Sequence, residues 1–244
     1  MKFFILVLSM ASFSIHAQAQ RPDANQYVQC LSMTTDLGVN GPGTATMTSL
    51  QAHQLCDNVI DANATVDCFK AIRDKGLNGP STASLTFDFM VQMCTKGRNL
   101  DQRVTCFMDN RDKGLHGPST ESLTEANLLN LCRTTKNSVA TTSCFMTVRE
   151  LGLSGPGTES IPGEMIMELC GKSRQPEITA ACFQDARELG KFGHSDPQLN
   201  PNQKLNLCLR AQTANGPVSC YQSVRREGDT DQIVDINVKT CGRY

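Results

Sequence analysis

Residues 68–94 read CFKAIRDKGLNGPSTASLTFDFMVQMC and residues 106–132 read CFMDNRDKGLHGPSTESLTEANLLNLC, so two stretches of equal length begin and end with cysteine. Along the chain, intervals of 26 and 12 residues between cysteines alternate, and the last interval has 21. The two intervals together make a unit of 38 residues. A fixed period in this range is typical of a stacked repeat array.

Helix start and stop signals divide each unit into two helices. Side chains that cap helix N-termini recur before the first helix, at Asp23, Asp61, Asn99, Asn137, Gln175 and Thr213. A second column of caps stands at Thr48, Thr86, Thr124 and Asn200. Pro162 interrupts this column, which predicts a slightly different start for that helix. A glycine column supplies left-handed helix stops, at Gly38, Gly76, Gly114, Gly152, Gly190 and Gly228.

These signals predict an all-α fold, an α-solenoid of about six αα-hairpin repeats. The units span about 23–60, 61–98, 99–136, 137–174, 175–212 and 213–244, within one domain of residues 20–244. Apolar residues three apart, such as Val66, Phe69 and Ile72, give the first helix a buried face. We expect the aromatic column in the cores between repeats: Phe69, Phe107, Phe145, Phe183 and Tyr221.

The repeat allows two cysteine pairings. Pairing across the 12-residue intervals leaves Cys30 and Cys241 at opposite ends of a stack whose layers are each about 10 Å thick, and a disulfide spans at most about 7 Å between Cα atoms. Pairing across the longer intervals leaves no orphan and staples each hairpin once. The predicted disulfides are Cys30–Cys56, Cys68–Cys94, Cys106–Cys132, Cys144–Cys170, Cys182–Cys208 and Cys220–Cys241.

In this architecture the chain resembles the secreted cysteine-rich members of the tetratricopeptide-like superfamily, in which one disulfide staples each αα-hairpin. The resemblance covers all six units. It implies a right-handed helical solenoid that serves as a binding surface, and it carries no functional residue across because the helix signatures, period and cysteine spacing differ.

Residues 1–19 have the features of a secretory signal peptide: Lys2, an apolar run from Phe3 to Ile15, and a small-x-small exit ending at Ala19. The apolar run is shorter than the ~20 residues that cross a bilayer, so we expect no membrane span after cleavage and a periplasmic or secreted protein. The chain has 23 Lys plus Arg and 24 Asp plus Glu. This balance gives no indication of nucleic-acid binding.

No motif for a metal, a cofactor or a nucleophile is present. There is no C-x-x-C or H-x-x-H, and the predicted disulfides use every thiol, so we expect no metal, no cofactor and no catalytic cysteine. The mature histidines, His53, His116 and His194, occupy unrelated columns, and Ser-His chemistry lacks its sequence context. Glu159 and Glu164 are the nearest candidates for a carboxylate pair.

Two recurrent features suit a ligand. An arginine column could dock an extended anion or could satisfy carbonyls at helix C-termini; it comprises Arg73, Arg111, Arg149, Arg187 and Arg225. Loop 77–82 and its relatives, rich in Gly, Pro, Ser and Thr, could bind a partner or simply form turns.

The sequence therefore favours an exported, non-enzymatic helical-repeat scaffold that binds an unknown protein, peptide or envelope polymer. One alternative is a structural or cell-surface protein that self-associates or adheres. A second is a hydrolase-type enzyme.

Overall fold

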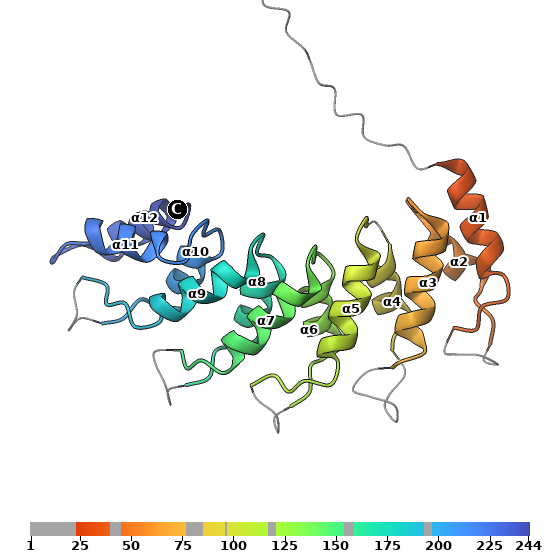
Figure 1. Cartoon of the computed structure of the whole chain (residues 1–244), viewed down its shortest axis with the longest axis horizontal. Coiled ribbons are helices and arrows are strands. Elements are labelled where there is room, and N and C mark those ends of the chain that lie inside the picture. The colour runs from red at the N-terminus through yellow and green to blue at the C-terminus, as the bar shows by residue number, and fades with distance from the viewer. Residues whose placement is uncertain are drawn as a thin grey trace, which may run out of the picture.

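The computed structural model describes residues 23–39, 45–76, 85–95, 97–116, 121–153, 159–192 and 197–244 (Figure 1). The predicted signal peptide, loop 77–82 and His194 lie outside these residues. The described part of the chain forms the helices α1 (Ala24–Thr34), α2 (Ser49–Cys56), α3 (Ala62–Arg73), α4 (Phe87–Cys94), α5 (Leu100–Asn110), α6 (Glu125–Cys132), α7 (Ser138–Arg149), α8 (Gly163–Gly171), α9 (Pro176–Ala186), α10 (Pro201–Cys208), α11 (Gly216–Val224) and α12 (Asp231–Cys241).

Consecutive helices pair into six units, from unit 1 with α1 and α2 to unit 6 with α11 and α12. The first helix of each unit packs against the first helix of the next, and the second helices pack likewise. The result is an α-solenoid, as predicted. Figure 1 shows a shallow arc, with the short loops between units along its inner edge and the long loops within units along its outer edge.

One disulfide closes each unit, in the six pairs that the cysteine spacing favours. Five bridges span 26 residues and the last spans 21, with Cα–Cα distances of 5.5–5.7 Å. On both helices of a unit, the bridged cysteine lies at least one helical turn away from the long loop. The long loop of unit 6 can therefore be shorter without moving the two helices that the disulfide joins.

Side-chain caps fix where most helices begin. Thr48, Thr124 and Asn200 each form a full capping box with the residue three positions later. The prediction of a different start for α8 was wrong: Pro162 occupies the same N-cap position and α8 begins at Gly163 without a side-chain cap. For α11 the N-cap position is Asn215, which makes no side-chain cap bond, and the Thr213 hydroxyl accepts from the backbone N–H of Gly216 (3.1 Å).

The glycine column has two conformations. Gly76 and Gly228 have φ of 65° and 87°, the left-handed form predicted for a helix stop. Gly38, Gly114, Gly152 and Gly190 instead form isolated antiparallel bridges with residues eight positions later. The bridges close the bases of the long loops, and they explain why the left-handed prediction was wrong at these four positions.

The core lies between the two helix layers and between units. The aromatic column is fully buried throughout, from Phe69 in unit 2 to Tyr221 in unit 6. The Tyr221 hydroxyl donates a hydrogen bond to the Lys191 carbonyl (2.7 Å), and burial raises the pKa of Tyr221 to about 12. Among the described residues, no helix is both long and apolar enough to span a membrane.

Candidate functional site

The arginine column points into the stack. Arg73, Arg149 and Arg225 donate to the carbonyls of Gly38, Gly114 and Gly190, 35 residues earlier, at 2.7–2.8 Å. These glycines belong to the preceding unit, so each guanidinium links two neighbouring repeats.

The two other arginines of the column share this placement. Arg111 donates to the carbonyls of Lys75 (2.6 Å) and Gly76 (3.2 Å), and Arg187 makes an ion pair with Glu188 (3.5 Å). The side chains of Arg73, Arg111, Arg149 and Arg187 are only 5–11% exposed. These side chains are buried, and Arg73, Arg111 and Arg149 donate to backbone carbonyls, which favours the carbonyl-satisfying role over an anion ladder.

The histidines lie in different units. His53 is on α2, and its Nδ1 shares a hydrogen bond with the Tyr27 hydroxyl. His116 lies in unit 3, two residues after Gly114, which forms the antiparallel bridge with Ser122. Glu164 stands in the first turn of α8, and Glu159 precedes that helix in the long loop. In the described part of the chain, no three His, Cys, Asp or Glu side chains are grouped so as to hold a metal ion.

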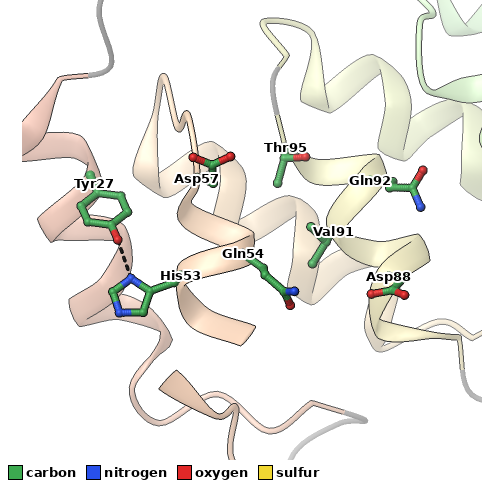
Figure 2. Close-up of a pocket in the computed structure, with 8 residues that line it drawn as sticks. All are labelled: Tyr27, His53, Gln54, Asp57, Asp88, Val91, Gln92 and Thr95. Carbon is green, nitrogen blue, oxygen red and sulfur yellow. Dashed lines mark hydrogen bonds between the residues drawn. The ribbon is translucent and has the colours of Figure 1, made fainter. Parts of the chain in front are cut away.

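His53 lines a shallow pocket of about 540 Å³ on the face formed by α1, α2 and α4. Figure 2 shows Tyr27 and His53 on one side and Asp88, Val91 and Gln92 on the other. Most of these side chains are exposed polar groups on helix surfaces. The pocket therefore supplies polar contacts without an enclosed floor.

The short loops have a charge bias that the rest of the chain lacks. Segments 95–99, 133–137, 172–175, 209–215 and 242–244 contain eight Lys or Arg residues and no Asp or Glu. Lys96 lies outside the described residues. We call the seven described, exposed residues of this set the basic edge: Arg98, Arg133, Lys136, Lys172, Arg174, Arg210 and Arg243. The first short loop, residues 57–61, is instead acidic, with Asp57 and Asp61.

Three consecutive loops of the basic edge meet in a cleft of about 920 Å³. Lys172 and Arg174 come from the loop after α8, Arg210 from the loop after α10, and Arg243 from the segment after α12. The Tyr244 carbonyl accepts hydrogen bonds from the backbone N–H groups of residues 212 and 213 (both 3.1 Å), which holds the last segment against the α10–α11 loop.

The cleft has an excess of positive charge. Lys172 pairs with Glu168 (2.9 Å), whereas Arg174, Arg210 and Arg243 have no ion-pair partner within the described ranges. Three exposed guanidiniums around one cleft present many N–H donors in a geometry that suits carboxylate, phosphate or sulfate oxygens.

A buried arginine of unit 3 also lies beside this edge. Arg103 is buried and donates to the carbonyls of Met93 (2.9 Å) and Thr95 (3.0 Å). Burial lowers the pKa of Arg103, and the charge of Arg133 in the next short loop lowers it further. Arg103 on α5 and Arg133 in the short loop after α6 are thus close enough to interact.

Sequence reasoning missed the basic edge. Arg98, Lys136 and Arg174 recur at the 38-residue period, as do Lys172 and Arg210, so a signal was present. The signal is weak because the charges are divided between two positions of the repeat. Arg133 stands at neither position.

No known protein family, no curated protein and no solved structure matches this chain.

Proposed function

We propose that the protein is an exported, non-enzymatic scaffold that binds an extended anionic partner, an acidic envelope polymer or acidic peptide, along the short-loop edge. One observation carries this proposal: eight basic and no acidic residues in the short segments from Thr95 onward. The cleft around Arg174, Arg210 and Arg243 is the strongest part of this surface because none of the three is neutralised by an ion pair with a described residue.

The spacing of the charges suits a long ligand better than a small one. Each short loop adds one or two cations, and successive loops are separated by one layer of helices, about 10 Å. A single small anion reaches only the cleft, whereas an extended chain reaches several units at once and gains from multivalency.

The side chains on the edge also favour anions over other polymers. Arginine binds carboxylate, phosphate and sulfate groups in a bidentate manner. Tyr244 is the only aromatic residue in the five segments, so the edge lacks the stacking platforms that single-stranded nucleic acids use.

The disulfides support the exported location in this proposal. Six closed bridges, with every cysteine of the chain paired, are typical of proteins that fold in an oxidising compartment. A two-helix unit has little core of its own, so these bridges and the stacking between units both stabilise the fold.

The test measures binding of fluorescein-labelled polyglutamate and dextran sulfate by fluorescence anisotropy. We expect at least one of the two to bind, with affinity that falls as salt rises, because exposed charges are screened. The variant Arg174→Gln/Arg210→Gln/Arg243→Gln should bind about 30-fold more weakly, since three exposed contacts of about 0.7 kcal/mol each sum to about 2 kcal/mol.

A matched control removes three cations from the long-loop edge, Lys75→Gln/Lys113→Gln/Arg226→Gln, and so changes the net charge equally. The control should bind like the wild type. If neither polymer binds, or if the two triple variants lose affinity equally, the short-loop edge is not the binding surface.

A further inference from the structure

The two ends of the solenoid expose residues whose equivalents in the other units are buried or half-buried. The residue four positions after the first cysteine of a unit is 0% exposed in units 1–5. These five residues are Thr34, Ile72, Asn110, Val148 and Ala186. The equivalent residue of unit 6, Val224, is 40% exposed. Within the described part of the chain, no helix pair packs over it.

The opposite end shows the complementary feature. Two positions before the first cysteine, Val66, Ala180 and Val218 are buried, at 0–8% exposed, and Val104 and Thr142 are half-buried. Val28 of unit 1 holds the same position and is 63% exposed.

These two positions meet across the junction between neighbouring units. Asn110 of unit 3 donates from Nδ2 to Oγ1 of Thr142 in unit 4 (2.8 Å). Asn110 is four positions after Cys106, and Thr142 is two positions before Cys144. A seventh unit stacked on unit 6 would therefore place its Val28 equivalent against Val224.

Charge at the two ends is complementary as well. The short-loop edge ends with Arg210 of unit 5 and Arg243 of unit 6, and it begins with Asp57 and Asp61 in the loop between units 1 and 2. The C-terminal face also carries exposed Ile233 and Ile236 on α12, at 42% and 56%.

We propose that the C-terminal face of one copy packs on the N-terminal face of a second copy, so that Val224 covers Val28 and the basic last loops meet the acidic first loop. This inference does not depend on the proposed anionic partner. The contact is weaker than an interior junction, because Thr35 stands where units 2–6 have the linking arginine. It is also head-to-tail, so it leaves one free end on each partner and continues into open chains.

Sedimentation velocity of the mature protein over a range of concentrations tests this contact. We expect the weight-average mass to rise above the monomer mass as concentration increases. Val28→Asp and Val224→Asp each block one end, and each variant alone should stay monomeric. Both positions are exposed, so the fold is retained, and far-UV circular dichroism checks this. The control Val139→Asp, at an exposed position on α7 in the middle of the stack, should assemble like the wild type.

Mixing the two end variants distinguishes a head-to-tail contact from every symmetric one. The Val28→Asp copy keeps its C-terminal face and the Val224→Asp copy keeps its N-terminal face, so the mixture should form dimers and nothing larger. A wild type that stays monomeric at all concentrations overturns the proposal. So does a mixture that forms no dimers, or a Val139→Asp variant that loses assembly to the same extent.

Discussion

Lys204 gives the fold a dependence on pH that can be measured. The residue is 1% exposed in α10, and its Nζ donates to the Leu153 carbonyl (2.8 Å) and to Oε1 of Gln198 (3.3 Å). Burial lowers the pKa of Lys204 to about 8 from 10.5, and the nearby charge of Arg187 adds to the shift. Between these two pKa values the folded protein favours the neutral amine, while the unfolded chain favours the ammonium.

The sign follows from proton linkage. Between pH 8 and pH 10.5 the unfolded state binds more protons than the folded state, so the free energy of unfolding rises with pH. A pKa of about 8 in the folded state gives a gain of at most about 2 kcal/mol between roughly pH 7 and pH 9.5. No free thiol is present to reshuffle the disulfides over this range.

The variant Lys204→Met isolates this contribution, since methionine stands at the equivalent position of unit 2, Met90. Urea unfolding followed by circular dichroism at both pH values should show the increase in the wild type and lose it in the variant. An exposed control, Lys239→Met, should keep the wild-type increase. If Lys204→Met and the wild type change equally with pH, the buried ammonium is not the cause.

Three further substitutions test the contacts between and within units. Arg149→Met removes the hydrogen bond to the Gly114 carbonyl and should lower the free energy of unfolding in urea by about 2 kcal/mol, because it leaves a buried acceptor unpaired. Asn110→Val should stay within about 1 kcal/mol of the wild type by thermal unfolding: it loses the Nδ2 bond to Thr142 but also removes the buried Oδ1, which has no partner among the described residues, and units 2, 4, 5 and 6 hold aliphatic residues there; a loss above about 3 kcal/mol would contradict this. Cys106→Ala/Cys132→Ala should cost about 3.5 kcal/mol in guanidinium unfolding from the loop-closure entropy alone, and an unchanged midpoint would refute that estimate.

The sequence predicted the architecture because covalent and periodic constraints are local. A 38-residue period with two caps per unit specifies two helices, and the bridge length then selects one cysteine pairing. The buried aromatic column followed from the same period. The conformation of the glycines did not, because whether Gly114 ends a helix or forms a bridge depends on Ser122 across the loop.

The surface was harder to predict because it is made by neighbouring units. Arg149 and Gly114 are 35 residues apart, and only the stacked structure shows that one donates to the other. Lys204 stands in a column that is otherwise apolar, with Met90, Leu128 and Ile166. A lysine at an apolar position of the repeat indicates a buried cation. Its hydrogen-bond acceptors, the Leu153 carbonyl and Gln198 Oε1, lie in loops whose positions the sequence does not predict.

The pattern of bridges also sets how far this molecule can lengthen under a pulling force. Each bridge holds its two cysteines at a Cα–Cα distance of 5.5–5.7 Å, so the residues enclosed between them cannot extend. Between Cys30 and Cys241, only the linkers from one bridge to the next can be drawn out. Each joins cysteines 12 positions apart and reaches about 40 Å at 3.3–3.6 Å per residue. Between Cys30 and Cys241 the chain therefore has a fixed maximum length under load, and its six clamped segments survive any load too weak to break a covalent bond.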